Sequence, residues 1–370
     1  MRITVFTHSL RSCWNHGNAH FLRGVLRELR ALGHDVTVHE PAGAWSLANL
    51  VADHGEAGAA ASLAPYPDLS SRIDPEGSDP AQAVDGADLV LVHEWNEPAL
   101  VARLGALRKA GGRFTLLFHD THHRAVSEPA AMRAYDLSGY DGVLAFGETL
   151  AAVYRDWGWG ERVFVWHEAA DTRLFRPPAR ETERQGLVWI GNWGDGERSA
   201  ELDAFLFRPA RAADLSLDVW GVRYPAEALA ALDRSGARYR GWLPNARAPE
   251  VFAQHLATVH VPRRFYVAAL PGIPTIRVFE ALACGIPLVC APWRDSEGLF
   301  TPGRDFLMAE DEAAMTRHLR ALRDDPGLRA ELAAHGLATI RARHTCAHRA
   351  AELIAVAERL AGPPRLKTAG

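Results

Sequence analysis

Residues 271–293 read PGIPTIRVFEALACGIPLVCAPW, and this stretch decides how the rest of the chain is interpreted. Its prolines and glycine predict an irregular entry loop, after which Thr275 is placed to cap a helix over residues 276–284. Gly285 ends that helix, and a proline two positions later prevents it from resuming. The apolar run at 288–290 then predicts a short buried strand, as in a parallel sheet.

Two charged residues interrupt the predicted helix. Arg277 and Glu280 stand three positions apart and therefore share one face. One interpretation is a surface ion pair worth about 0.2–0.5 kcal/mol. The other is a ligand site, because a cation beside a helix N-terminus suits a diphosphate and a carboxylate one turn deeper offers two acceptor oxygens to vicinal hydroxyls. The surrounding motif favours the second interpretation, which describes the phosphates and ribose of a nucleotide.

The segment FEALACGIPLVCAP resembles the donor-site signature of retaining, family-4-like glycosyltransferases of the GT-B fold. The overlapping run RVFEALACG is typical of the spore-maturation-type (CgeB-like) branch of that superfamily. The resemblance implies that Glu280 holds the ribose hydroxyls of a nucleotide sugar. The chain departs from the larger family at one position: a second glutamate, which contacts the donor sugar in that family, is replaced here by Gly272.

Length and composition bound the possibilities. A chain of 370 residues with ordinary hydrophobic content is large enough for two domains, each with its own core. The net charge of −4 gives no global footprint for nucleic acid, so we expect no nucleic-acid partner. Lysine occurs only at Lys109 and Lys367, which is typical of a GC-rich bacterial genome. Any phosphate-binding cation is therefore an arginine.

Cysteine usage and hydropathy indicate a cytoplasmic protein. The four cysteines form no C-x-x-C pair and no zinc spacing, as expected of buried, reduced thiols. No apolar run approaches the roughly 20 residues that span a bilayer. The N-terminal MRITVFTH is too short in its apolar part for a signal peptide and predicts a first core strand.

The first half opens with a βαβ unit. Strands are predicted at 3–6 and 36–39, with a helix at 19–32 between them, so the connecting loop lies where open α/β sheets bind ligands. Gly17 and Asn18 would let a phosphate or sugar approach backbone N–H groups, although a plain turn explains them equally well. The resemblance, which places a glycine-containing loop against the donor, favours binding.

Three arginines, at 23, 27 and 30, line one side of the first predicted helix. Their simplest interpretation is a solvated face. Peripheral contact with an anionic membrane is the alternative and is not favoured.

The densest titratable cluster follows a buried strand predicted at 114–118, where the sequence reads HDTHH. His119, Asp120 and His122 are the candidate catalytic residues, because polar groups at strand carboxyl ends carry the chemistry of α/β folds. A metal site is disfavoured, since no HExxH motif or carboxylate-histidine triad is present. Simple capping of a strand exit is the structural alternative. In the family that the chain resembles, a histidine here contacts the donor sugar; His119 matches best and His122 is the alternative.

The passage HEAADTRLFRPP resembles the family's exit from the first domain, and two prolines begin a linker. We therefore predict an acceptor-side Rossmann-like domain at 1–178 and a donor-side one at 179–345. Residues 346–370 are predicted to form a helix that crosses back to the first domain, followed by a loose tail.

The second half begins with a strand at 187–190 and the Gly-rich loop GNWGDGERS. Gly191 and Asn192 would present backbone N–H groups to phosphate with Arg198 as the adjacent cation, and a flexible turn is the alternative. The loop is neither a Walker motif nor G-x-G-x-x-G. Further on, Trp242 and Leu243 would border a nucleotide base, although a core tryptophan is as reasonable.

These observations predict an α/β protein of the GT-B type, with two doubly wound parallel-sheet domains facing across a cleft. The predicted function is transfer of a sugar from a nucleoside diphosphate, UDP or GDP, to a lipid-linked, protein or small-molecule acceptor. No D-x-D motif occurs, so we expect no metal and no cofactor beyond the nucleotide-sugar co-substrate. Arg198 and Arg277 would then stabilise the leaving diphosphate.

Retention of configuration is expected from the resemblance, with the departing phosphate accepting the acceptor's proton. An inverting enzyme would instead need a base, for which Asp120, His119 and His122 are the candidates. Two other functions fit the same fold. A nucleotide-sugar epimerase would act without an acceptor, and a non-catalytic binding or scaffold protein would neither hydrolyse nor transfer the donor sugar.

Overall fold

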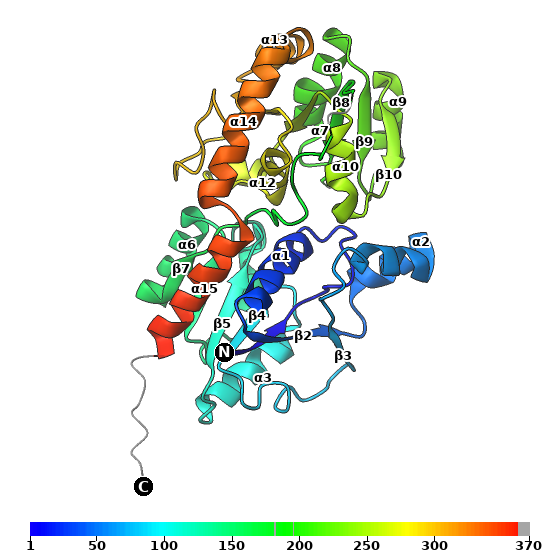
Figure 1. The fold of residues 1–370 in the computed structure, drawn as a ribbon. Helices are drawn as coiled ribbons and strands as arrows, with labels where there is room; N and C mark the ends of the chain where they lie inside the picture. The colour runs from blue at the N-terminus through cyan, green and yellow to red at the C-terminus, as the bar shows by residue number, and fades with distance from the viewer. Residues whose placement is uncertain (181–182, 195, 362–370) are drawn as a thin grey trace.

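The computed structural model describes residues 1–180, 183–194 and 196–361, which form two parallel β-sheets, each covered by helices on both faces (Figure 1). Residues 181–182 of the predicted linker, residue 195 of the Gly-rich loop and the predicted tail lie outside the described residues. The predicted pair of doubly wound parallel sheets is confirmed.

The first sheet has seven strands in the order β3-β2-β1-β4-β5-β6-β7, and every neighbouring pair is parallel. The order reverses direction beside β1, which places the loops after β1 and β4 on either side of a crevice. The strands are β1 (Arg2–Phe6), β2 (Asp35–Pro41), β3 (Arg72–Asp74), β4 (Leu89–His93), β5 (Thr115–Asp120), β6 (Gly142–Ala145) and β7 (Val163–Val165).

Helices alternate with these strands, as right-handed parallel crossovers require. They are α1 (Asn18–Ala31), α2 (Trp45–Leu63), α3 (Pro98–Lys109), α4 (Arg124–Ser127), α5 (Pro129–Arg133) and α6 (Glu148–Tyr154), with short turns η1 (Arg155–Trp159) and η2 (Gly160–Arg162).

The second sheet has six strands in the order β10-β9-β8-β11-β12-β13, again with parallel pairs throughout. Its strands are β8 (Leu187–Ile190), β9 (Leu217–Trp220), β10 (Arg238–Gly241), β11 (Ala257–His260), β12 (Leu288–Cys290) and β13 (Leu307–Met308). Its helices are α7 (Ser199–Leu202), α8 (Arg208–Ala212), α9 (Ala226–Ser235), α10 (Ala248–Ala253), α11 (Arg264–Ala268), α12 (Ile276–Ala283), α13 (Glu312–Asp324) and α14 (Pro326–Arg343), with turns η3 (Asp203–Phe207) and η4 (Asn245–Arg247).

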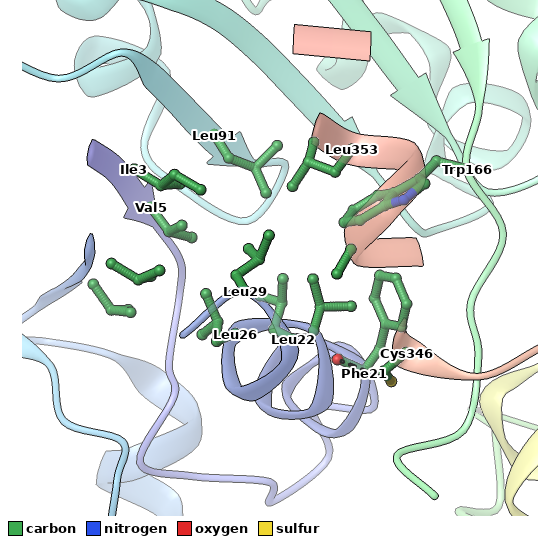
Figure 2. Packing of buried hydrophobic residues seen from close by; sticks show 14 of the residues in the cluster. Ile3, Val5, Phe21, Leu22, Leu26, Leu29, Leu91, Trp166, Cys346 and Leu353 are labelled. Atoms are coloured by element: carbon green, nitrogen blue, oxygen red, sulfur yellow. Dashed lines mark hydrogen bonds between the residues drawn. The ribbon is translucent and has the colours of Figure 1, made fainter. Parts of the chain in front are cut away.

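The last helix, α15 (Cys346–Ala361), packs beside α1 on the first sheet (Figure 1). Figure 2 shows the apolar face of α1, with Phe21, Leu22, Leu26 and Leu29, directed at side chains from β1, β4 and α15. These α1 positions recur at helical spacing and are at most 1% exposed. The chain therefore leaves the second sheet and completes the core of the first, while the predicted division at residue 178 stays a prediction.

The predicted solvated arginine face of α1 is wrong at one position. Arg23 is completely buried, where it donates hydrogen bonds to the Leu10 carbonyl and to Ser62 Oγ. Its guanidinium also lies over the ring of Tyr66, 5.1 Å from the centroid. The sequence pattern misses this because a buried arginine is stabilised by tertiary partners that lie far along the chain.

The organising helix begins as predicted, but its cap differs. Thr275 has extended backbone angles, and its side chain makes no capping hydrogen bond to the helix. Instead, Thr275 Oγ1 lies 3.3 Å from His260 Nε2 at the end of β11. The helix ends one residue earlier than predicted, and Gly285 follows with a φ of +63°.

The contact of α15 with α1 depends on a glycine. A Cβ atom on Gly24 would lie 2.5 Å from Cys346 Sγ and 2.8 Å from Asp171 Cβ. Gly24→Ala should therefore destabilise the protein by about 1–3 kcal/mol, because two packed segments must shift. Chemical denaturation followed by circular dichroism measures the change.

Gly105→Ala in α3 is the matched control. A Cβ atom there would meet nothing closer than 3.5 Å, so the better helix propensity of alanine should leave stability unchanged or raise it by up to about 1 kcal/mol. Equal effects of the two substitutions would show that α15 does not constrain α1.

Candidate active site

A cleft of about 610 Å³ lies between the two sheets and takes side chains from both. This volume is in the range of small-molecule sites. Its walls come from the loops that follow parallel strands, namely β1, β4 and β5 on one side and β8, β9, β10 and β11 on the other. The N-terminus of α12 closes one end of the wall. This is the edge at which open parallel sheets bind ligands, because loops at strand carboxyl ends diverge there.

The sequence-predicted residues divide into two groups. Nine line the cleft: Gly17, Asn18, His122, Gly191, Asn192, Arg198, Trp242, Leu243 and Arg277. Three lie behind its walls and are at most 1% exposed: His119, Asp120 and Glu280. The structure thus brings residues from both halves of the sequence to one cavity, with a deeper layer beneath it.

Glu280 is the centre of that deeper layer. Its carboxylate accepts hydrogen bonds from Arg277 and from Asn245 Nδ2 at 2.8 Å, and both of these residues line the cleft. Across the domain boundary, His20 Nδ1 of α1 lies 3.2 Å from Oε1. Burial alone would raise the pKa of Glu280, but Arg277 and His20 outweigh it and hold that pKa below its ordinary value. Glu280 is therefore an anion that positions cleft-lining donors.

The same cluster joins the two domains through Cys13. The backbone N–H of Asn245 donates to Cys13 Sγ at 3.5 Å, and Cys13 belongs to the loop after β1. Burial raises the pKa of Cys13, yet hydrogen bonding to His20 and the charge of Arg23 lower it to about 6. Cys13 of the first domain therefore contacts the group of residues that surrounds Glu280 in the second.

Arg198 supplies the main buried cation of the Gly-rich loop. It is 9% exposed, and its guanidinium donates to the backbone carbonyls of Val261, Asn192 and Trp193. Burial and the neighbouring Arg263 lower its pKa to about 10, so it remains cationic at neutral pH. A cation fixed by neutral carbonyls and facing a cleft is suited to an anionic ligand.

The Gly-rich loop and the loop after β10 form the remainder of the donor-side wall. Asn192 accepts a hydrogen bond from the Val222 N–H at 2.9 Å and donates to Asn15 of the first domain. Trp242 packs against His54 with 4.7 Å between ring centroids, and its indole Nε1 has no partner within the described residues. A flat indole with an unpaired donor, followed by Leu243, offers an apolar platform with one polar contact.

The predicted catalytic pair lies below the cleft. Asp120 is the last residue of β5 and accepts hydrogen bonds from the Tyr154 hydroxyl at 2.8 Å and from the His122 N–H at 3.0 Å. Burial raises the pKa of Asp120, and burial together with Asp120 raises that of the neighbouring Glu94. Asp120 thus fixes the backbone that presents His122 to the cleft.

His119 is enclosed by aromatic rings. Its centroid lies 4.7 Å from that of Trp166 and 5.5 Å from that of His93, and burial lowers its pKa to about 3. Its ring nitrogens have no hydrogen-bond partner within the described residues. The strand continues through both His119 and Asp120, two residues beyond the predicted end. Their catalytic roles stay a prediction.

Many cleft residues were not predicted from the sequence, among them Trp45, Trp95, Tyr266 and Glu168. Trp45 and Trp95 stand together with 6.5 Å between centroids, while Tyr266 and Glu168 come from opposite domains. Glu168 had a usable signal, since it lies two residues after the strand-like run at 163–166, at the edge where α/β folds bind ligands. The others had none, because nothing in an isolated tryptophan or tyrosine separates a core ring from a cleft wall.

Glu168 gives the cleft a pH-dependent stability. Burial and the charge of Glu280 raise its pKa to about 8, against an ordinary value near 4.5. Between these values the unfolded chain ionises while the folded protein keeps the proton, so stability falls as pH rises from about 5 to 8. Glu168→Gln should remove the share of this decline that Glu168 contributes, several kcal/mol at about 1.4 kcal/mol per pKa unit, and leave the share of Asp120 and Glu94. Denaturation midpoints across that range measure it.

Glu128→Gln, at an exposed position on the rim of the same cleft, should leave the pH profile of stability unchanged. A Glu168→Gln profile that keeps the slope of the wild type would mean that Glu168 is ionised in the folded protein at pH 5.

The described residues contain no cluster of three His, Cys, Asp or Glu side chains placed to hold a metal ion. Within the same ranges, none of the helices combines the length and apolarity needed to traverse a bilayer.

Two family profiles match the sequence. Residues 17–174 match Glycosyltransferase Family 4, and residues 198–355 match the Glycosyl transferase-like family. The first match begins at Gly17 and contains the cleft loops that follow β4 and β5, and the second contains Arg198 and α12. No curated protein matches the sequence.

Solved glycosyltransferases share the fold over nearly the whole chain. An alpha-glucosyltransferase in complex with UDP and a 13-mer DNA has a TM-score of 0.67 at 11% identity, covering 96% of this chain and 99% of that one. Anabaena HepE in complex with UDP and glucose has a TM-score of 0.67 at 13% identity, covering 96% and 98%. T4 phage BGT in complex with UDP-glucose has a TM-score of 0.60 at 12% identity, covering 98% and 100%.

These neighbours correct one expectation. The sequence analysis excluded a nucleic-acid partner because the net charge is −4, yet two of the neighbours are glucosyltransferases bound to UDP and DNA. The exclusion was wrong. Net charge describes the field of the whole molecule, whereas contact with a nucleic acid depends on the charges of one face.

Profile matches on both halves, two facing parallel sheets and a cleft between them agree with one another. The chain is therefore a glycosyltransferase of the GT-B fold, in which residues 17–174 match the Glycosyltransferase Family 4 model and residues 198–355 match the Glycosyl transferase-like model.

Proposed function

We propose that this enzyme transfers a sugar from a UDP-sugar to an acceptor, without a metal ion and with retention of configuration. The observation that carries the proposal is the cationic wall of the cleft, in which Arg198, Arg277 and the N-terminus of α12 face the same space. The neighbours with bound UDP support the choice of nucleotide. The motif RVFEALACG supports membership of the spore-maturation-type branch.

The ribose would lie at the cluster of Arg277, Asn245 and Glu280. The amide of Asn245 and the guanidinium of Arg277 line the cleft and would donate hydrogen bonds to ribose oxygens, while Glu280 holds both groups from behind the wall. The short contacts from Arg277 and Asn245 to Glu280 keep these donors in place before the nucleotide arrives. The uracil would lie on the platform formed by Trp242 and Leu243.

The diphosphate would lie between Arg198 and the first turn of α12, with Gly17 and Asn18 opposite. The leaving diphosphate gains negative charge in the transition state, and fixed donors stabilise that charge without reorganising. The side-chain amide of Asn18 has no partner within the described residues, although Asn18 is only 6% exposed. Such a group is available to a ligand oxygen.

Retention would let the departing phosphate take the acceptor's proton. This agrees with the position of Asp120, whose carboxyl group lies buried behind the wall of the cleft. The neighbours include both alpha- and beta-glucosyltransferases, so stereochemistry has to be measured by proton NMR of the product anomer. The acceptor panel should hold lipid-linked, peptide, small-molecule and DNA acceptors.

A nucleotide panel tests the donor site. UDP at 100 times its dissociation constant should stabilise the wild type by about 2.7 kcal/mol, whereas GDP, ADP, TDP and CDP should stabilise it less. Glu280→Ala should lose most of the UDP increment, because Arg277 and Asn245 lose the group that positions them. Thermal shift, compared as ligand-induced increments, is the measurement.

Glu280→Gln keeps the shape of the side chain, so it tests the same point even if the alanine variant misfolds. Glu250→Ala, at an exposed position on α10, is the control and should retain the full UDP increment. Failure of all five nucleotides to stabilise the wild type would favour the scaffold alternative. Interconversion of the donor sugar without an acceptor would favour the epimerase.

Arg198→Gln should lower kcat for transfer or donor hydrolysis by about 10²–10³-fold, since one fixed cation on the leaving group is lost. Steady-state kinetics with released UDP as the readout measures this. Arg264→Gln, which removes an exposed arginine paired with Glu201, should change kcat less than threefold. Similar losses in the two variants would place the diphosphate elsewhere.

A further inference from the structure

Glu168 occupies a distinct place in the cleft. It lies three residues beyond the end of β7, is 6% exposed and lines the cavity together with Ile276, the first residue of α12. Burial raises the pKa of its carboxyl group, and the backbone N–H of Ile276 acts in the opposite direction. The carboxyl group therefore belongs to the part of the cleft wall where the diphosphate is proposed to lie.

Glu168 interacts with groups from two parts of the cleft. Its charge interacts with those of Arg277 and Glu280, at the proposed ribose end. It also acts on Tyr266, whose ring centroid lies 5.6 Å from that of His123. The His123 and His122 rings lie 4.0 Å apart, and the Trp95 ring lies 5.3 Å from that of His122. Glu168 is therefore near both the nucleotide end and the aromatic part of the cleft.

Few other carboxyl groups reach this part of the cavity. Among the described residues that line the cleft, only Glu128 and Glu168 carry carboxyl groups, and Glu128 is exposed. The loop before α12 contributes none, because Gly272 has a φ of +95° and a Cβ atom there would lie 2.1 Å from Ser296 Oγ. The nearby Glu297 is held by His167 at 2.8 Å and by the Glu148 N–H at 2.9 Å, and does not line the cleft.

We propose that Glu168 hydrogen-bonds to hydroxyl groups of the transferred sugar and selects which sugar the enzyme accepts. This inference rests on the proposed function, because the sugar is attached to the phosphate that α12 receives. A sugar joined there has its ring next to the first turn of α12, where Glu168 lies. A buried carboxyl group discriminates between sugars, because a sugar that leaves it without a hydrogen bond binds more weakly.

Protonation suits this role. Burial and Glu280 raise the pKa of Glu168 to about 8, so at neutral pH the carboxyl group both donates and accepts. A sugar hydroxyl also does both. The group can therefore pair with a hydroxyl in either direction, and an epimer that moves the hydroxyl away leaves it unsatisfied.

The test compares the donor with and without its sugar. Dissociation constants of UDP and of four UDP-sugars (glucose, galactose, N-acetylglucosamine and glucuronate) are measured by calorimetry for the wild type, Glu168→Ala and Glu168→Gln. Donor hydrolysis gives kcat/KM for each sugar. In both variants UDP affinity should change less than threefold.

For the preferred sugar, Glu168→Ala should lower kcat/KM by about 10–100-fold, and preference among the four sugars should fall to within about threefold. Glu168→Gln should lose less, because its amide still pairs with a hydroxyl. Glu297→Gln is the matched control and should keep the sugar preference of the wild type. Because the glutamine variant preserves size, it yields a result even if the alanine variant misfolds.

Equal losses of affinity for UDP and UDP-sugars would overturn the inference, since Glu168 would then act only on the α12 N-terminus. An unchanged sugar preference in both variants would overturn it as well. Failure of UDP to bind the wild type is a separate result that overturns the proposed function first and this inference with it.

Discussion

The buried carboxylate of Glu280 imposes the constraint on which the rest of the structure depends. A charge 1% exposed is stable only if donors surround it, and the donors here come from both domains: Arg277 and Asn245 from one, His20 from the other. Removing one partner of such a group typically costs about 3–5 kcal/mol, because the remaining charge stays buried. Glu280 therefore holds the two domains together at the donor end and orients Arg277 and Asn245 in the cleft wall.

The opposite end of the interface is held by packing. After the second sheet the chain returns as α15, which packs beside α1 (Figures 1 and 2). Gly24 permits the close approach, and Trp166 donates its indole N–H to the Arg349 carbonyl at 2.9 Å. A parallel β-bridge between Ala170 and Thr345 pairs the two segments of chain that pass between the domains. The apolar packing of α15 on α1 and the polar residues around Glu280 thus hold the two domains together, and the cleft stays open to a ligand.

Buried polar groups below the cleft position residues that line it. Asp120 accepts from Tyr154 and holds the backbone of His122, while His119 fills an aromatic niche beneath. The histidines that burial keeps neutral, among them His119 and His122, add polarity without adding charge. The positive character of the cleft therefore comes from its arginines, whose charge burial does not remove, as at Arg198.

The sequence by itself determined the two parallel sheets, the organising helix and nine of the cleft-lining residues, because hydrophobic periodicity and Gly/Pro punctuation are local signals and parallel strands bring their carboxyl ends to one edge. Gly17, Arg198 and Arg277 were found in this way. Only the tertiary structure decided that Glu280 and Asp120 lie behind the wall, that Arg23 is buried and that Glu168 faces the cavity. Depth in the fold and partners across the domain boundary depend on how segments far apart in the chain pack, and no local pattern carries that information.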